Sequence, residues 1–210
     1  MQKGNSFDEK AATWDDNPNR IKLVEQVWDH IKSLVDFSTI DKVLDYGSGT
    51  GLLGYKAIKL AKEVTFCDNS AGMLEQVIKK SKFYGYQNVK IIQSDFIVDD
   101  LPDERFDLIL SMLVLHHVEN IDLLLSIFHK LLKPGGMFCW IDLDKEDGTF
   151  HSDNTGIAHF GFAEEQVKKD LLSNGFSIVS YSNTITIPKD TEKGERHFPI
   201  FVGLGRKQEG

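Results

Sequence analysis

The sequence predicts an α/β protein with a doubly wound, mostly parallel sheet and helices on both of its faces. Between residues 41 and 142, short apolar runs alternate with segments of helical periodicity, which is typical of βαβ units. The first apolar run ends in three alternating glycines, and the chain closes with two segments of alternating apolar and polar residues. These observations indicate five parallel strands followed by an antiparallel pair.

Composition and charge limit the classes of protein to which the chain can belong. The 210 residues are 41% apolar and 27% charged, and we expect them to form one domain. No run of about 18 apolar residues suggests a membrane span, and the polar residues 1–10 do not resemble a secretory signal. Cys67 and Cys139 fit neither a disulfide framework nor a cysteine zinc site, so we expect a cytoplasmic protein. The formal net charge of −8 disfavours a nucleic-acid substrate.

The N-terminal part is predicted to lead into one helix. Residues 1–19 are polar, with a mobile lead-in and a short ordered piece expected around residues 11–14. Apolar residues then recur at helical spacing from Arg20 to Val35, and Asn19 is placed to cap that helix. Trp14 can pack as an anchor for this helix.

A glycine-rich stretch, Asp45-Tyr46-Gly47-Ser48-Gly49-Thr50-Gly51, joins a predicted strand at residues 42–46 to a predicted helix at residues 51–61. Glycine lets a ligand approach the backbone, and a helix start offers unpaired N–H groups. A dinucleotide site requires G-x-G-x-x-G, but the chain has leucine at position 52. The carboxylate of Asp45 would repel a pyrophosphate and attract a cationic amino group. The alternative is a glycine turn that only connects strand to helix.

An acid ends the second predicted strand, residues 63–68. In an α/β unit a carboxylate at the position of Asp68 can accept hydrogen bonds from ribose hydroxyls. The alternative role for Asp68 is to cap the next helix, which starts within residues 69–73 and continues to about Phe83, although Ser70 can fill that role.

The third predicted strand, residues 89–93, is followed by Ser94, Asp95 and Phe96. An acid here can accept a hydrogen bond from the amino group of adenine, and an aromatic side chain can flank the base. An ordinary turn at the end of the strand is the alternative.

A fourth predicted strand, residues 106–112, is continuously apolar, as a central parallel strand should be. It lies beside the first strand at the topological switch point, where open α/β sheets bind ligands, so Ser111 and Met112 are candidate wall residues. A predicted helix at residues 120–132 ends at Lys133-Pro134-Gly135-Gly136, and a fifth strand covers residues 137–142.

Four blocks within residues 41–142 resemble class I S-adenosylmethionine-dependent methyltransferases of the small-molecule type. They are D-x-G-x-G-x-G, the acid at Asp68, Ser94-Asp95-Phe96, and the turn L-L-K-P-G-G. The resemblance implies a Rossmann-like, seven-stranded sheet in the order 3-2-1-4-5-7-6, with strand seven antiparallel. It also implies S-adenosylmethionine as the cofactor, S-adenosylhomocysteine as the product, Asp68 on the ribose and Met73 against the adenine.

Other segments add to the resemblance or depart from it. Residues 7–15 are similar to the opening of family members in which an aromatic residue and an acid close over the cofactor, which is a second role for Trp14. Tyr46 and Ser48 depart from the usual pattern, and Ser48 can add a hydroxyl to the cofactor's carboxylate. No D/N-P-P-Y/F motif follows the fourth strand, which argues against methylation of amino groups in nucleic acid. The predicted cofactor-binding residues are therefore Trp14, Asp45, Gly47, Ser48, Gly49, Asp68, Asn69, Met73, Ser94, Asp95, Phe96, Ser111 and Met112.

Residues 143–162 form a long polar loop, which we expect to bind the substrate and to overhang the cofactor. His116, His151 and His159 are candidates for the substrate pocket, because imidazole titrates near neutrality and can take a proton from an acceptor. The alternative for each is a hydrogen-bonded structural histidine. No metal is predicted, since the spacing of these histidines and Asp153 matches no established metal pattern.

The C-terminal part is predicted to complete the sheet. A helix is expected at residues 163–174, followed by antiparallel strands at residues 176–187 and 196–205 with a charged, mobile connection at residues 188–195. One domain would then comprise an N-terminal lid and helix (1–38), a cofactor core (39–142) and a substrate part (143–210).

The favoured function is transfer of a methyl group to a small molecule by in-line displacement. A methyltransferase-like protein that binds the cofactor without turnover, as a sensor or partner subunit, is the main alternative, because a fold does not determine function. A nicotinamide-dependent oxidoreductase is disfavoured by Leu52 and Asp45.

Overall fold

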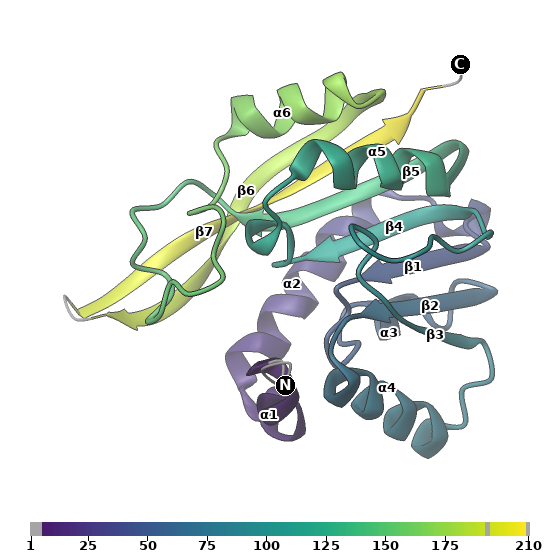
Figure 1. The fold of residues 1–210 in the computed structure, drawn as a ribbon, viewed down its shortest axis with the longest axis horizontal. Helices are drawn as coiled ribbons and strands as arrows, with labels where there is room; N and C mark the ends of the chain where they lie inside the picture. The colour runs from purple at the N-terminus through teal and green to yellow at the C-terminus, as the bar shows by residue number, and fades with distance from the viewer. Residues whose placement is uncertain (1–5, 192–193, 209–210) are drawn as a thin grey trace.

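The computed structural model describes residues 6–191 and 194–208, and a seven-stranded sheet lies at its centre (Figure 1). The strand order is β3-β2-β1-β4-β5-β7-β6, with β7 antiparallel to both of its neighbours and the other described pairs parallel. The order expected from the family resemblance is therefore confirmed. The strands are β1 (Lys42–Tyr46), β2 (Glu63–Asp68), β3 (Val89–Gln93), β4 (Phe106–Met112), β5 (Leu132–Leu143), β6 (Phe176–Thr191) and β7 (Gly194–Lys207).

Helices cover both faces of this sheet because its strands are apolar on both sides. Met137, Cys139 and Ile141 of β5 belong to one core cluster, whereas Phe138 and Trp140 belong to the other, as the two-residue period of a strand requires. The first cluster includes side chains of α2 (Pro18–Leu34), α3 (Gly54–Ala57) and α4 (Ala71–Tyr84), and the second those of α5 (Ile121–Leu131) and α6 (Glu164–Ser173). The remaining described helices are α1 (Ser6–Lys10), η1 (Ala11–Asp16), η2 (Phe37–Thr39) and η3 (Leu115–His117).

Two helices differ from the sequence-based expectation. Helix α2 begins at Pro18, because Asn17 and not Asn19 is its N-cap: the Asn17 side chain accepts a hydrogen bond from the backbone N–H of Asn19 at 3.0 Å. The helix predicted at residues 51–61 is α-helical only from Gly54 to Ala57. Gly51 has a φ of +84°, which the helix cannot include, and turns occupy the rest of that range.

The C-terminal strands are longer than predicted. Strand β5 begins at Leu132, so the turn at residues 133–136 lies inside it. Residues 188–191 and 194–195, predicted to be a mobile connection, instead continue the β6–β7 hairpin, where Lys189 pairs with Arg196. Of the mobile lead-in predicted before residue 11, residues 1–5 lie outside the described residues, whereas residues 6–10 form helix α1 and contradict the expectation.

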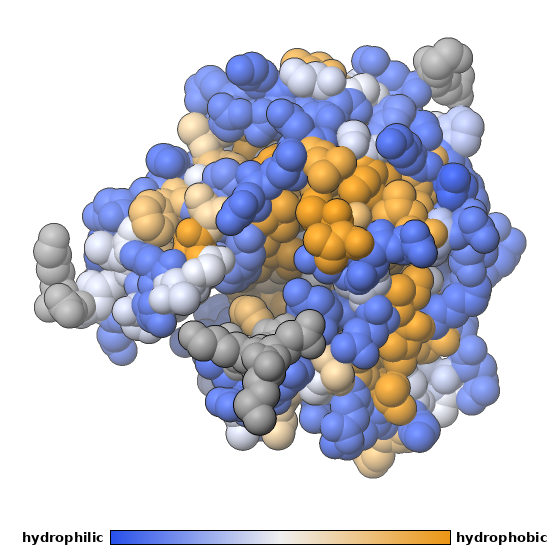
Figure 2. All heavy atoms as spheres, viewed as in Figure 1, coloured by the Kyte–Doolittle hydropathy of each residue, from blue (hydrophilic) through white to orange (hydrophobic). Residues whose placement is uncertain are grey.

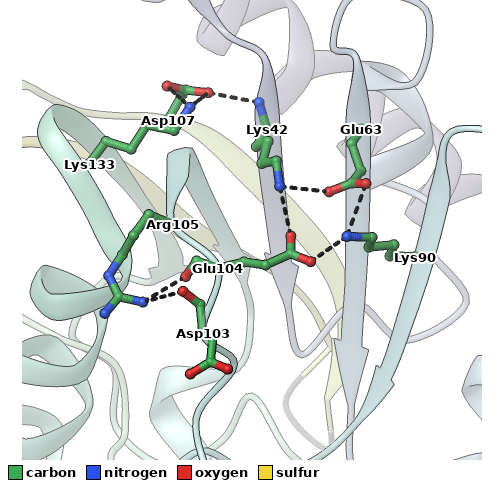
Figure 3. Close-up of polar contacts among 8 residues, drawn as sticks. All are labelled: Lys42, Glu63, Lys90, Asp103, Glu104, Arg105, Asp107 and Lys133. Atoms are coloured by element: carbon green, nitrogen blue, oxygen red, sulfur yellow. Dashed lines mark hydrogen bonds and ion pairs between the residues drawn. The ribbon is translucent and has the colours of Figure 1, made fainter.

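The amino ends of the first four strands carry a network of ion pairs (Figure 3). Glu104 binds the ammonium groups of Lys42, at 3.0 Å, and Lys90, and Glu63 lies within 3.4 Å of the same two lysines. Asp107 in turn accepts from the backbone N–H of Lys42 at 2.8 Å. These charges belong to the edge of the sheet opposite the carboxyl ends of the strands, so they tie the strands together away from any ligand site.

Candidate functional site

A cavity of about 1430 Å³ lies at the carboxyl ends of β1, β2 and β4. The N-terminal segment, the start of α2, the loop after β5 and the β6–β7 hairpin complete its walls. Figure 2 shows that face hollowed between the hairpin side and the centre of the molecule. A single ligand site is typically about 300–1,000 Å³, so this cavity has room for more than one small molecule.

Thirteen of the sixteen predicted site residues line this cavity: Trp14, Asp45, Gly47, Ser48, Gly49, Asp68, Asn69, Met73, Ser94, Asp95, Met112, His116 and His151.

The other three predicted residues lie elsewhere. Phe96 is buried with its ring 5.1 Å from that of Tyr46, and the hydroxyl of Ser111 donates to the backbone carbonyl of Tyr46 at 3.0 Å, so both face the core. His159 lines a separate pocket of about 380 Å³ beside α5 and α6, and its Nε2 atom lies 2.9 Å from the carbonyl of Val118. None of these three residues therefore lines the large cavity, because the side chains of Phe96 and Ser111 turn to the core and that of His159 turns to the separate pocket.

The glycines after β1 serve different purposes. A Cβ atom at Gly47 would lie 2.3 Å from Val114, so Gly47 packs against the segment that follows β4. A Cβ atom at Gly49 would meet only Met73 and Trp14, at 3.9 and 4.0 Å, and therefore points into the cavity. Gly54 allows the short helix α3 to pack against Phe66, where a Cβ atom would lie at 2.6 Å. Gly54 thus does the packing usually done by the third glycine of a dinucleotide motif, although its spacing does not match that motif.

Asp45 is almost completely buried beneath the glycine loop. Its Oδ2 atom accepts a hydrogen bond from the backbone N–H of Gly54 at 2.9 Å. Burial, with a smaller contribution from the negative charge of Asp68, raises the pKa of Asp45 to about 7. A cationic group bound here would be the missing partner of this carboxyl group.

Asp68 connects β2 to the glycine loop. One carboxylate oxygen accepts from the backbone N–H of Gly49 at 2.7 Å and the other from that of Ser70 at 2.8 Å. Ser70 is the N-cap of α4, since its hydroxyl accepts from Met73 N, so the capping role considered for Asp68 is excluded. Each carboxylate oxygen can accept a second hydrogen bond, which leaves Asp68 able to bind a hydroxyl in the cavity.

A nucleoside-like ligand with an amino-acid end needs polar partners in the cavity, and two further groups can supply them. The hydroxyl of Ser48 is buried and has no hydrogen-bond partner among the described residues, so a ligand carboxylate would satisfy it. Asp95 accepts from the backbone N–H of Ile97 at 3.0 Å, and this bond fixes its carboxylate at the wall of the cavity. The residues present therefore fit such a ligand.

The N-terminal segment, residues 6–16, is fastened beside the cavity at two points. Asp8 accepts hydrogen bonds from Ser70 Oγ at 2.5 Å and Gly72 N at 2.8 Å. Asp15 accepts from the hydroxyl of Thr50 at 2.6 Å and pairs with Lys80. Both acids belong to the segment that resembles the opening of the family, but their partners were not predicted, because the partners of a polar N-terminal segment cannot be read from its own pattern.

Trp14 lies between these two anchoring points and the start of α2. It lines the cavity, and the guanidinium of Arg20 stacks 3.8 Å from its ring centroid. Trp14 is thus in contact with helix α2 and with the ligand space, so both roles considered for it agree with its position.

A histidine–aspartate pair lies at η3, and its histidine, His116, lines the cavity. The Nδ1 atom of His116 lies 2.6 Å from Asp142 Oδ1, and both side chains are buried. The backbone N–H groups of His116 and Leu143 also donate to this carboxylate, at 3.2 and 2.8 Å. Sequence analysis missed Asp142, although an acid at the carboxyl end of a parallel strand is the same signal that identified Asp68.

Two more imidazoles surround His116. The rings of His117 and His151 lie 4.2 and 5.1 Å from its ring centroid. Burial first, and then the proximity of His116, lowers the pKa of His151 to about 4 and also lowers the pKa of His117. The Nε2 atoms of His116 and His151 are buried and have no hydrogen-bond partner among the described residues.

A seven-stranded sheet in this order, with a glycine loop and two strand-end acids at its switch point, defines the class I methyltransferase fold. The chain belongs to the methyltransferase domain family, whose family model matches residues 38–191.

Relatives of known sequence agree with this assignment. An uncharacterised methyltransferase of Oceanobacillus iheyensis is 31% identical over 142 residues, which cover 65% of this chain and 64% of that protein. A ubiquinone biosynthesis O-methyltransferase of Pasteurella multocida is 27% identical over 158 residues, which cover 69% of this chain and 65% of that protein. The aligned region is therefore less than two thirds of the length of these relatives.

Solved structures share the fold at low sequence identity. The DhpI–SAH complex has a TM-score of 0.75 at 19% identity, covering 97% of this chain and 94% of that one. The YcgJ protein of Bacillus subtilis has a TM-score of 0.71 at 15% identity, covering 89% of this chain and 99% of that one.

None of the helices within residues 6–191 and 194–208 is both long and apolar enough to cross a membrane.

Proposed function

We propose that the protein is an S-adenosylmethionine-dependent methyltransferase that acts on a small molecule. The observation that carries this proposal is the position of Asp68, whose carboxylate is held against the glycine loop at the wall of a large cavity. Membership of the methyltransferase domain family supports it, as do relatives such as the ubiquinone biosynthesis O-methyltransferases.

The residues present suggest how each part of the cofactor is bound. Asp68 would accept from the ribose hydroxyls. Asp45 would face the cationic amino group, and the unpartnered hydroxyl of Ser48 would donate to the carboxylate. The adenine would lie near Met73 and Asp95, which line the same end of the cavity together with Asn69 and Ser94.

When bound, the cofactor would supply an activated methyl group on a sulfonium centre. The task of the protein is then to align an acceptor and to exclude water. Trp14 and the N-terminal segment cover one side of the cavity, and the loop that carries His151 covers another. Product S-adenosylhomocysteine would keep the same contacts through its ribose and amino-acid end.

The acceptor is proposed to occupy the part of the cavity beyond the glycine loop. That part is lined by the hairpin residues Thr184 to Lys189 and by the loop residues Phe150 to Asp153. A blocked substrate side would have favoured a cofactor-binding protein without turnover. Because this side is hollow, the catalytic interpretation is the stronger of the two.

Calorimetric titration with S-adenosylmethionine, S-adenosylhomocysteine and NAD⁺ tests the proposal. We expect the first two to bind with micromolar affinity and NAD⁺ not to bind. Asp68→Asn should weaken binding by about 10- to 100-fold, because a hydrogen bond to a charged group contributes about 1.5–3 kcal/mol. Asp103→Asn, in the loop before β4 at the opposite edge of the sheet, is the matched control. Binding of NAD⁺ alone, or equal affinity of the Asp68 variant, would contradict the proposal.

A further inference from the structure

We infer that the methyl acceptor is a hydroxyl group, that His116 Nε2 removes its proton, and that His151 holds its oxygen. This inference rests on the proposed function and assigns its substrate class. The two imidazole nitrogens are buried polar atoms without partners among the described residues, and both residues line the same cavity. Such atoms are rare in folded proteins, and a ligand group that pairs with both would account for them.

Asp142 determines which nitrogen of His116 carries the proton. A carboxylate only accepts hydrogen bonds, so the contact of 2.6 Å places the proton on Nδ1 and leaves a free electron pair on Nε2. The carboxylate is fully buried, and the His116 ring is its only side-chain partner among the described residues. When Nε2 gains a proton, the resulting imidazolium compensates this buried charge.

The neighbouring imidazoles confine that positive charge to His116. His117 donates its Nδ1–H to the carbonyl of Gly156 at 2.9 Å, and its lowered pKa keeps it neutral. His151, with a pKa of about 4, is neutral at pH 7 and can donate one ring N–H to an oxygen. His117 and His151 are therefore neutral neighbours of the ring that contacts Asp142.

His151 comes from the loop after β5, and its ring covers that of His116. The Nε2 atoms of both rings are buried. A small shift of the loop would let a hydroxyl enter between the two rings, donate to His116 and accept from His151. The base is then shielded from water until the acceptor is present.

A hydroxyl is the acceptor that needs this arrangement. A neutral amine attacks without first losing a proton, and a thiol ionises near pH 8.5. A phenol ionises only near pH 10, so it needs a base at the moment of attack. In the proposed step His116 Nε2 takes the hydroxyl proton while the oxygen bonds to the methyl carbon. The carbon–sulfur bond breaks, and its electron pair remains on sulfur as a neutral thioether.

Nitrogen NMR of the histidine rings gives a readout that does not depend on turnover. In the full chain saturated with S-adenosylhomocysteine at pH 7.5, we expect neutral His116 with its proton on Nδ1. Asp142→Asn should move that proton to Nε2, because the new amide can donate to Nδ1. A proton on Nε2 in the wild-type protein would overturn the inference.

Methyl transfer from labelled S-adenosylmethionine to matched hydroxyl, amine and thiol forms of small aromatic compounds is the second test. We expect labelled methyl ethers only, with a rate that falls by about 10²- to 10⁴-fold in Asp142→Asn. His151→Phe keeps the ring packing and removes the donor, so it serves if the first variant unfolds; it should also slow transfer. His30→Gln, on α2 outside the cavity, is the control.

These tests distinguish failure of the proposed function from failure of the hydroxyl inference. If S-adenosylmethionine fails to bind, the proposed function is wrong whatever the histidine protonation. If it binds and the label goes to amines or thiols at the same rate in Asp142→Asn, the function stands and the hydroxyl inference is wrong.

Discussion

His116 and Asp142 lie 26 residues apart, on η3 and β5, yet Nδ1 of the histidine is 2.6 Å from Oδ1 of the aspartate. Neither side chain has appreciable contact with solvent. A substitution in such a pair lowers the stability of the fold as well as changing the site, because removing one partner leaves the other buried without its hydrogen bond.

The first expectation concerns this pair. His116→Leu leaves the Asp142 carboxylate without its side-chain partner and should lower the free energy of unfolding by about 3–5 kcal/mol at pH 7. Adding Asp142→Asn removes the buried charge and should recover a large part of that loss. Urea denaturation of the single and double variants measures both values. Equal stability of the two would mean that the carboxylate is not charged in the folded protein.

The second expectation concerns Asp45 and pH. Its pKa of about 7 means that half of the free protein carries a proton there at neutral pH, and a cationic ligand binds only the ionised form. Affinity for S-adenosylmethionine should therefore rise by about tenfold from pH 6 to pH 8. Calorimetry in buffers of different ionisation enthalpy should detect proton release on binding at pH 7.

Asp45→Asn is the control for that measurement. It keeps an acceptor for the N–H of Gly54 but cannot ionise. We expect weaker binding whose remaining pH dependence comes only from the ligand. If the wild-type protein and the variant show the same pH profile, Asp45 does not face the cation.

The third expectation is that two glycines of the loop after β1 respond differently to substitution. Gly47→Ala places a Cβ atom against Val114 at a positive φ and should cost about 2–4 kcal/mol of stability, part of which Val114→Ala should restore. Gly49→Ala meets no close neighbour and should cost only about 1–2 kcal/mol of backbone strain. It should nevertheless weaken cofactor binding at least tenfold, since its methyl group enters the cavity. Thermal unfolding and calorimetry on both variants provide the comparison.

The fourth expectation concerns acid stability. Hydrogen bonds from Lys90 and then Lys42 lower the pKa of Glu104 to about 2, against 4.5 in the unfolded chain. The stabilisation is therefore present above about pH 4.5 and is lost as the pH falls towards 2. Because Glu104 is one third exposed, we expect only about 1 kcal/mol from it. Glu104→Gln or high salt should remove this increment at pH 6 and have no effect near pH 2.

The parallel core of the fold was predictable from the sequence, because each of its strands is marked by its own residues. Strands β1 to β4 match their predicted bounds because each is a short apolar run between turn residues. The overall order of the sheet came from the family resemblance. The extent of β6 and β7 could not be predicted, since their charged ends pair only across the hairpin, Lys189 with Arg196.

The site was predictable where its residues lie at, or just after, the carboxyl end of a strand. Asp45, Asp68 and the glycines fall at the carboxyl ends of β1 and β2, which the topology brings to one edge. Asp142 obeys the same rule, but its importance appears only when His116 is placed beside it. Asp8 and Asp15 depend on partners more than 30 residues away, which no local pattern encodes.

The two acids of the N-terminal segment have a consequence for the lifetime of a complex. Asp8 binds Ser70 and Gly72, a few residues after Asp68, and Asp15 binds Thr50, which follows Gly49. We therefore expect the docking of this segment and the occupancy of the cavity to be thermodynamically linked. A ligand that touches Trp14 only in the closed form slows its own escape, and a substitution at Asp8 would shorten residence time without touching the ligand. We therefore expect the off-rate of a bound cofactor to depend partly on a segment that takes no part in the chemistry.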